Sequence, residues 1–549
     1  MDDVDAVQAQ IARNMLDSGN WVTARLDGIA YLEKSPLKYW MIATSFAIFG
    51  VHDWAARLPL ALSTVLLCWF TARFGMWAFG VRVGLYAGLT MATSIGLFLF
   101  TRILIPDVIL TLAIAIALWC LLRTLESDAS ASRKWAWCMW AAMGTGLLLK
   151  GLIAAMFPVA VGLLYLALTR QLGSWRKLRP FSGMVIFLAI AAPWHVLATL
   201  QNPPYFDFTM HSEGGSYHGF FWFYFINEHI LRFLNLRYPR DYNTVPRLYF
   251  WLFHVLWFFP WSLYLPAVFR LGFRGHDRAS RVRLLALCWC GVVLGFFTFS
   301  TTQEYYSMPC YPAIALLLGC AIASGAPWLK YGTRIAAAIC AAAAAAIAVI
   351  LWQVRLLPAP GDISSALTQN PDVYTLSLGH MTDLTLKAFA YLRLPLLLAG
   401  VAFVIGAIGR RPAAFAVMMV LFFHAARIAM VAFDPYMASR PLAEALNQSP
   451  PGTLIVDDQY YTFSSIFFYT NRRALLLNGR VNNLEYGSYA PDAPQGIFVA
   501  DRDLPALWNS PDRYYLVADG HQTSRLRHLL GDRLVSVKAS GGKNLFTNH

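Results

Sequence analysis

The sequence predicts an α-helical membrane protein that crosses the bilayer many times and carries a small C-terminal α/β domain. Of its 549 residues, 58% are hydrophobic and only 13% are charged, and the mean hydropathy is +0.48. Apolar runs recur between residues 56 and 433 too often, and are too long, for the core of a soluble protein. After residue 434 charged residues become more frequent, and Gly and Pro separate short β-branched runs.

The formal net charge of +14 indicates membrane topology rather than nucleic-acid binding. Most Arg and Lys residues lie in short loops between apolar runs, where the positive-inside bias places them. The eight cysteines lie in or beside apolar runs, so neither a disulfide framework nor a zinc-binding spacing is visible. We therefore expect membrane lipids, and no nucleic acid, as partners of the chain.

Residues 1–55 are predicted to form an outer loop with interfacial helices. An apolar stripe at helical spacing consists of Val7, Ile11, Met15 and Leu16. We expect this helix to lie on the membrane surface with its polar face in water. The apolar run 37–51 is shorter than the ~20 residues that cross a bilayer, so it is assigned to a second interfacial helix.

Twelve membrane-spanning segments are predicted after this loop. They lie near residues 56–79, 83–101, 106–124, 135–149, 151–169, 182–200, 247–269, 284–300, 308–324, 335–353, 388–408 and 412–433. With residues 1–55 outside, all six inside loops carry Arg or Lys, as the positive-inside bias requires. The chain then divides into an outer catalytic loop (1–55), a transmembrane domain (56–433) and an outer α/β domain (434–549).

The C-terminal domain is predicted from short apolar runs bounded by turn residues. Three runs are expected to be buried strands, namely Thr453–Val456, Gly496–Val499 and Arg513–Val517. Thr523–Leu530 is expected to be a helix. Asp457 and Asp458 end the first strand, and we interpret them as structural because solvated acids are common at strand ends.

Several short motifs carry a resemblance to a known family. They are Asp2–Met15, Tyr31-Leu-Glu-Lys-Ser-Pro36, Trp54–Pro59, Arg102–Asp107, Lys150-Gly151, Pro193-Trp194, Asn227–Phe233, Pro260-Trp261 and Tyr305–Pro312. In this order the motifs resemble those of the bacterial integral-membrane glycosyltransferases, which include the aminoarabinose lipid A transferases and the wider protein-mannosyltransferase-like group, family 39. The resemblance implies a GT-C fold and a polyprenyl-phosphate-linked sugar as donor. It also implies transfer to a lipid, glycan or protein acceptor at the periplasmic face of the bacterial inner membrane.

The sequence departs from the family pattern in its first outer loop. The family has an Asp-Glu pair there, which falls on Val4 and Asp5, and the Arg that follows falls on Val7. The cation that contacts the lipid phosphate is therefore missing or supplied by another residue. At Glu304 the family more often has Lys-Leu-Pro, so contacts to the sugar or acceptor are expected to differ.

The chemistry of sugar transfer assigns roles to the charged residues of the outer side. A carboxylate must take the proton of the acceptor hydroxyl, and cations must stabilise the departing phosphate. The catalytic candidates are Asp2, Asp3, Asp5 and Asp107, and the donor-phosphate candidates are Lys34, Lys150, Arg232 and Arg237. The candidate contacts to acceptor or sugar are Glu33, Glu228, His229, Glu304, Tyr305 and Tyr306.

Simpler roles stay open for some of these residues. Asp107 could cap the helix that opens at Val108, and Lys150 could extend its charge from a helix end into the interface. Glu33 together with His211, His218 or His229 could bind a divalent metal, although scattered histidines favour a solvated role. No other cofactor is expected.

Two other classes of function remain, a transporter of a lipid-linked substrate and a non-catalytic envelope assembly protein. A transporter favours charges deep within interrupted helices, whereas the acids here lie in outer loops. We also expect a further spanning helix upstream of Met1, because the family enters its first outer loop from such a helix and residues 1–55 carry no export signal. The alternative is that the span at 56–79 carries this tail across.

Overall fold

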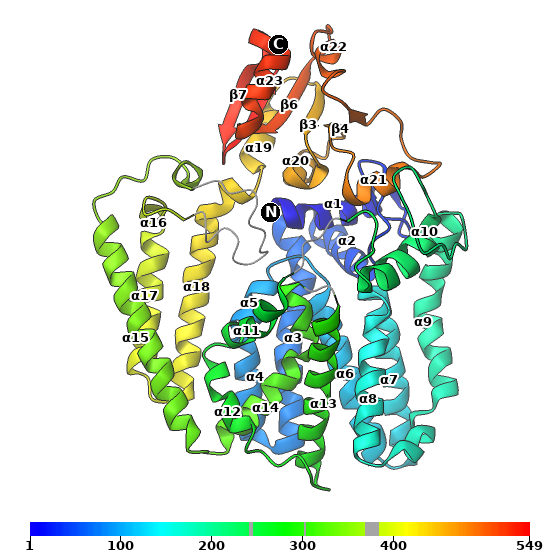
Figure 1. Cartoon of the computed structure of the whole chain (residues 1–549), viewed down its shortest axis with the longest axis vertical. Coiled ribbons are helices and arrows are strands. Elements are labelled where there is room, and N and C mark those ends of the chain that lie inside the picture. Colours follow the sequence, from blue (N-terminus) through cyan, green and yellow to red (C-terminus); the bar gives the residue numbers. More distant parts are fainter. Residues whose placement is uncertain (241–244, 301–302, 368–383) are drawn as a thin grey trace.

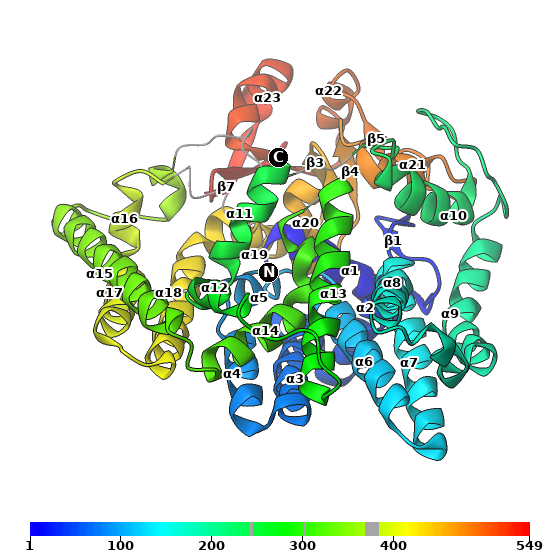
Figure 2. The same cartoon turned by 60° about the horizontal axis from the view of Figure 1, so that its bottom comes forward.

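The computed structural model describes residues 1–240, 245–300, 303–367 and 384–549. It shows a helical body with a mixed α/β domain at one end, and the N-terminal helix α1 (Asp3–Ser18) lies between them (Figures 1 and 2). Parts of the segments 201–246 and 354–387, which separate predicted spans and are expected outside the membrane, lie outside the described residues. The predicted fold class is confirmed.

Long apolar helices build the body. Seven described helices are long and apolar enough to cross a membrane: α3 (Asp53–Phe79), α6 (Asp107–Glu126), α9 (Pro180–Gln201), α13 (Arg278–Phe299), η4–α14 (Glu304–Ala323), α15 (Trp328–Val354) and α18 (Pro412–Met437). An eighth span is formed if the pair Arg247–Trp257 and Trp261–Val268, bent by 94°, crosses as one unit. The expected number of twelve spans is not confirmed.

The difference from twelve comes from breaks and short helices that hydropathy does not detect. The predicted span 83–101 is divided between α4 (Val81–Ala92) and α5 (Ile95–Phe100), because the helix ends at Thr93 and restarts after Ser94. Two other predicted spans are the 16-residue helices α8 (Ile153–Leu168) and α17 (Arg393–Ile408). Helix α7 (Ala129–Lys150) is long enough to cross but starts with a polar turn.

The N-terminal segment is folded beneath the C-terminal domain rather than spread on a membrane surface. Asp2 caps α1 by accepting from the Asp5 amide at 2.8 Å, and Gly19 ends the helix with φ 70°. The apolar stripe is buried, as predicted. The polar face, however, is also covered, since the Arg13 guanidinium donates to the Phe468 carbonyl at 2.9 Å. The expected surface position of α1 is therefore wrong.

The rest of the N-terminal segment leads from α1 to the helical body. It forms the hairpin β1 (Arg25–Leu26) and β2 (Ile29–Ala30), followed by α2 (Leu37–Phe49). Helix α2 has 13 residues, as expected of a helix too short to cross the bilayer. Helix α1 packs on α2 from one side and on α20 (Ser464–Thr470) from the other.

The C-terminal domain contains a six-stranded sheet with the order β5-β4-β3-β6-β8-β7. Its strands are β3 (Thr453–Asp457), β4 (Ala474–Leu477), β5 (Phe498–Val499), β6 (Tyr514–Asp519), β7 (Val535–Ser540) and β8 (Lys543–Thr547). The first four are parallel, and β8 runs antiparallel to both β6 and β7. The expected α/β domain is confirmed, and β5 is shorter than predicted because Gly496 has φ 76°.

Three helices of the C-terminal domain connect the parallel strands, namely α20, α21 (Asn482–Ser488) and α22 (Leu504–Trp508). Helix α19 (Arg440–Gln448) precedes β3, and α23 (Thr523–Leu530) lies between β6 and β7. Helix α23 has the predicted bounds. Gly541 and Gly542 both have positive φ and form the two-residue turn that joins β7 to β8.

A buried ion pair joins the two ends of the described chain. The Lys543 ammonium, at the start of β8, lies 2.6 Å from a carboxylate oxygen of Asp3 and 3.1 Å from the Ser439 hydroxyl. The Ser465 amide also donates to Asp3, at 2.8 Å. Both charged side chains are 10% exposed. Asp3 therefore holds the C-terminal domain on α1.

Replacing Lys543 by Met should destabilise the fold by roughly 3 kcal/mol, because it leaves the Asp3 carboxylate buried without its cation. Thermal unfolding in detergent measures the change. Lys538→Met on β7 is the matched control, since Lys538 is exposed. The double variant with Asp3→Asn should recover part of the loss, and equal melting temperatures for the Lys543 and Lys538 variants would contradict the assignment.

Candidate active site

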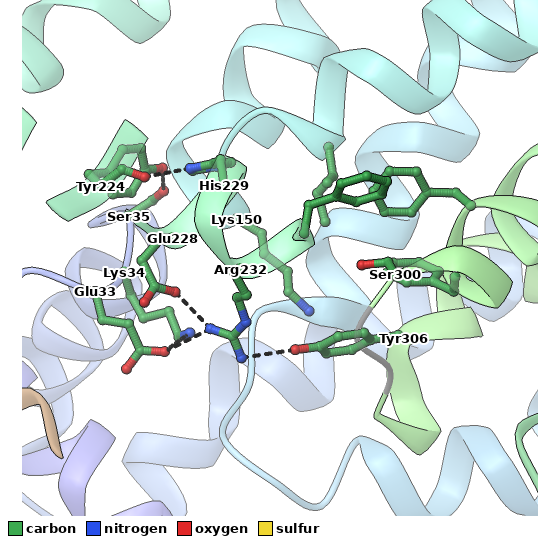
Figure 3. A pocket seen from close by; sticks show the side chains of 14 residues that line it. Glu33, Lys34, Ser35, Lys150, Tyr224, Glu228, His229, Arg232, Ser300 and Tyr306 are labelled. Carbon is green, nitrogen blue, oxygen red and sulfur yellow. Dashed lines mark hydrogen bonds and ion pairs between the residues drawn. The ribbon is translucent and has the colours of Figure 1, made fainter. Parts of the chain in front are cut away.

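A cavity of about 120 Å³ is lined by the segment that precedes α2 and by residues of the helical body, and it has one charged and one apolar side (Figure 3). The charged and polar lining consists of Glu33, Lys34, Ser35, Lys150, Tyr224, Glu228, His229, Arg232, Ser300 and Tyr306. The apolar lining consists of Ile153, Phe233, Phe296 and Phe297. Three cations and two carboxylates line the cavity, so it carries a net positive charge and suits an anion with an apolar attachment.

Glu33 and Lys34 form the centre of the charged side. They follow β2 directly and make an ion pair with each other. Glu33 also accepts from the Tyr31 hydroxyl at 2.6 Å and lies 3.6 Å from the Arg232 guanidinium. Burial raises the pKa of Glu33, but Lys34, Arg237 and Arg232 outweigh this effect and lower it below its ordinary value. The carboxylate is therefore ionised.

A π-helix, η2 (Trp222–Leu231), carries the second cavity-lining carboxylate, Glu228, and is followed at once by the cavity-lining Arg232. The wide turn is rare and is typical of functional positions. Glu228 accepts from Arg232 at 2.7 Å and is also paired with Arg237. Arg232 extends toward the cavity and donates to the Tyr306 hydroxyl at 3.1 Å (Figure 3). Burial opposes the ionisation of Glu228, but Arg237 and Arg232 lower its pKa.

His229 has both ring nitrogens occupied by the backbone. Its Nδ1 lies 2.5 Å from the Tyr224 carbonyl, to which it must donate, and its Nε2 accepts from the Leu152 amide at 3.1 Å. Burial lowers the pKa of His229, in agreement with a neutral ring. Gly151 permits this approach, because a Cβ there would lie 2.2 Å from Nε2.

No metal site is found in the described part of the chain. There, no group of three or more His, Cys, Asp or Glu residues could hold a metal ion. His218 is 2.6 Å from Asp207 and His211 is exposed, so neither joins Glu33.

Lys150 links the cavity to one of the predicted catalytic acids. It is the last residue of α7, and its ammonium lies 2.5 Å from Asp107 and 4.6 Å from the centre of the Tyr306 ring. Asp107 is the first residue of α6 and makes no side-chain cap, so the capping alternative is wrong. Its second oxygen, Oδ2, is buried without a hydrogen bond in the described structure.

The other predicted acids have different surroundings from one another. Asp5 is 1% exposed, lies 2.5 Å from Arg57 and accepts from the Leu104 amide at 2.7 Å. Burial, together with the nearby Asp2, raises the pKa of Asp5 to about 7. Asp2 is the cap of α1, and Asp3 binds the C-terminal domain, away from the cavity lining.

The predicted turn at residue 304 lies beside Lys150. Tyr305 and Tyr306 both present their rings to the Lys150 ammonium, at 5.1 and 4.6 Å from the ring centres. Glu304 is 2% exposed and does not line the cavity. Cation–π contacts of this kind hold a lysine without neutralising its charge.

Four residues at or near the site were not among the predicted contacts. Tyr31 and Asn483 hold Glu33, Arg57 holds Asp5, and Lys38 is buried with its ammonium 3.2 Å from the Leu104 carbonyl. Arg57 and Tyr31 belong to motifs of the family resemblance, which could have indicated them. Asn483 lies far along the chain, in a domain that matches the family only loosely, and no sequence signal points to it.

Comparison with known proteins agrees with the resemblance seen in the sequence. The family model for dolichyl-phosphate-mannose-protein mannosyltransferases matches residues 33–196. An undecaprenyl phosphate-alpha-4-amino-4-deoxy-L-arabinose arabinosyl transferase 2 of Pseudomonas fluorescens is 31% identical over 324 residues, which cover 57% of this chain and 54% of the relative. The corresponding transferase of Shewanella sediminis is 25% identical over 541 residues, which cover 91% of this chain and 87% of the relative.

Solved structures identify the fold. ArnT from Cupriavidus metallidurans, in a crystal structure bound to undecaprenyl phosphate, superposes with a TM-score of 0.78, at 22% identity, over 99% of this chain and 93% of that protein. Its apo form gives a TM-score of 0.77. The chain therefore has the GT-C fold of the polytopic membrane glycosyltransferases. Within that class it is similar to the ArnT-type transferases, as the sequence motifs indicated, although the alignments span only about half the length of the first curated relatives.

Stability should fall as the pH rises from about 4 to 7, because two buried carboxyl groups keep their protons in the folded protein. The pKa values of Asp5 and Asp27 are both raised to about 7, mainly by burial. A raised carboxyl pKa means that the folded state binds protons more tightly than the unfolded state, so this stability is complete below about pH 4 and is lost through pH 7.

Asp5→Asn and Asp27→Asn, which resemble the protonated side chains, should each flatten the dependence of the melting temperature on pH. Asp503→Asn is the control, because Asp503 is exposed. An unchanged slope in both test variants would show that these carboxyl groups are ionised in the folded protein at neutral pH.

Proposed function

We propose that this protein is a glycosyltransferase that moves a sugar from a polyprenyl-phosphate donor to an acceptor hydroxyl. The observation that carries the proposal is the convergence of Lys34, Lys150 and Arg232 on a cavity whose other side is apolar. A polyprenyl phosphate has the matching parts, an anionic head and a hydrocarbon chain. Cations that surround the phosphate also stabilise it as a leaving group.

In the proposed reaction the acceptor oxygen bonds to the anomeric carbon of the sugar while the bond from that carbon to the phosphate oxygen breaks. The electron pair of the broken bond stays on the polyprenyl phosphate, and the acceptor proton passes to a carboxylate. Lys150 and Arg232 would bind the phosphate, and Tyr306 would hold Arg232 in place. No metal is needed to balance these steps.

Asp107 and Asp5 are the proposed bases. Asp107 is paired with a cavity-lining lysine and keeps one buried oxygen without a hydrogen bond in the described structure. Asp5 has a raised pKa, which suits a base that must accept a proton near neutral pH. Asp3 is not proposed as a base, because Lys543 and Ser439 occupy its carboxylate.

The sugar, the acceptor and the location are proposed from the similar proteins. The names of the relatives specify undecaprenyl phosphate and 4-amino-4-deoxy-L-arabinose, so we propose an undecaprenyl-phosphate-linked pentose of this kind as donor. A lipid acceptor at the periplasmic face of the inner membrane would place the cavity and the C-terminal domain outside. Mass spectrometry of envelope lipids and glycans from a deletion strain tests the sugar and the acceptor.

Lys150→Ala should raise the Michaelis constant for the donor about tenfold or more, because a charge-assisted contact to phosphate contributes roughly 1.5–3 kcal/mol. Lys34→Ala should act in the same direction. Lys177→Ala, on an exposed turn, is the control and should leave the constant unchanged. Unchanged constants in both test variants would place the phosphate elsewhere.

Replacing the base by Asn should lower turnover on the order of 10²- to 10⁴-fold with little change in donor binding. If Asp5 is the base, the rate of the unmodified protein should rise with pH through about 7 as Asp5 loses its proton. Steady-state rates of Asp5→Asn and Asp107→Asn between pH 5 and 9 separate the two acids. Near-normal turnover in either variant would exclude that acid as the base. As a control, both variants should bind the donor as the unmodified protein does.

A further inference from the structure

Helix α21 of the C-terminal domain reaches the charged side of the cavity. Its residue Asn483 is 4% exposed and lies between two members of the charge network. The Asn483 amide nitrogen donates to Glu33 Oε2 at 2.6 Å, and its amide oxygen accepts from Arg237 Nη2 at 2.7 Å. One neutral side chain thus touches an anion and a cation that belong to two separate segments outside the C-terminal domain.

The position of α21 is fixed by close contacts on both sides of Asn483. The Tyr486 ring stacks on Phe223 with ring centres 4.2 Å apart, and its hydroxyl donates to the Gly219 carbonyl at 3.1 Å. On the other side, a Cβ at Gly487 would lie 2.1 Å from the Ala30 carbonyl oxygen, so the helix and the β2 strand touch through backbone. Asn483 consequently has little freedom to move.

The contacts of Asn483 extend to the cavity-lining cations through one intermediate on the Glu33 side and two on the Arg237 side. Glu33 is paired with Lys34, and Arg237 is paired with Glu228, which in turn binds Arg232. An amide is suited to this place because it donates to the carboxylate and accepts from the guanidinium at once. An aspartate would repel Glu33, and an alanine would remove one hydrogen-bond partner from each of two buried charged groups.

We infer that Asn483 is a positioning residue of the donor-phosphate site, through which the C-terminal domain completes a site whose lining cations all lie outside that domain. The inference rests on the proposed function, since it assigns the same cavity to a polyprenyl phosphate. Asn483 does not line the cavity, so it acts through Glu33 and Arg237 and touches no substrate.

The test measures the binding of undecaprenyl monophosphate to the full-length protein in detergent, together with the melting temperature. Asn483→Ala should weaken binding about tenfold, and Asn483→Asp about a hundredfold, since aspartate adds a buried repulsion to the lost contact. Because Asp has the shape of Asn, this variant should keep the packing of α21. The donor Michaelis constant should change by the same factors, with a smaller change in turnover.

Asn482→Gly is the matched control. Asn482 is the neighbouring residue, but its amide donates to Gln459 within the C-terminal domain at 2.7 Å, and its φ of 57° is compatible with glycine. This variant should bind the probe like the unmodified protein.

Three results would overturn the inference. Equal binding by the unmodified protein and both Asn483 variants would leave the proposed function intact and reject the positioning role. Equal losses for Ala and Asp, in proportion to a lowered melting temperature, would assign Asn483 to packing alone. Failure of the unmodified protein to bind the probe would reject the proposed function and the inference together.

Discussion

The ionised carboxylate of Glu33 imposes the constraint on which the site depends. A carboxylate in a partly apolar cavity loses several kcal/mol of hydration unless cations and hydrogen-bond donors surround it. Here the donors come from distant segments: Lys34 is adjacent, Arg232 follows the π-helix, and Asn483 belongs to the C-terminal domain. The π-helix, the tight Gly151 turn and the docking of α21 all serve to bring these groups together.

Much of this arrangement could be predicted from sequence because its signals are local. Hydropathy and charge identify the membrane class, and short apolar runs bounded by turn residues identify three of the six strands of the C-terminal domain, β3, β5 and β6. Motifs such as Glu33-Lys34 and Lys150-Gly151 lie in short stretches of sequence, and seven of the fourteen candidate site residues line one cavity. They are Glu33, Lys34, Lys150, Glu228, His229, Arg232 and Tyr306.

What could not be predicted depends on contacts between distant segments. The helical period of α1 shows that Val7 and Ile11 share a buried face, but it cannot show that the C-terminal domain covers the opposite face. For the same reason, adjacent acids with similar sequence surroundings have unlike partners: Asp3 meets Lys543 and Asp5 meets Arg57. The twelve predicted spans are not confirmed, because average hydropathy does not detect a break such as Thr93–Ser94.

The Asp3–Lys543 ion pair can form only after nearly the whole chain has been synthesised. Its members are 540 residues apart, so α1 leaves the ribosome long before the strand that covers it has been synthesised. Contacts of such long range form slowly and late in folding. Until then the C-terminal domain does not cover the acids of the first segment. The site of an unfinished chain is therefore exposed and lacks Asn483. Premature termination within the last hundred residues should therefore produce chains that insert into the membrane but are cleared by proteolysis.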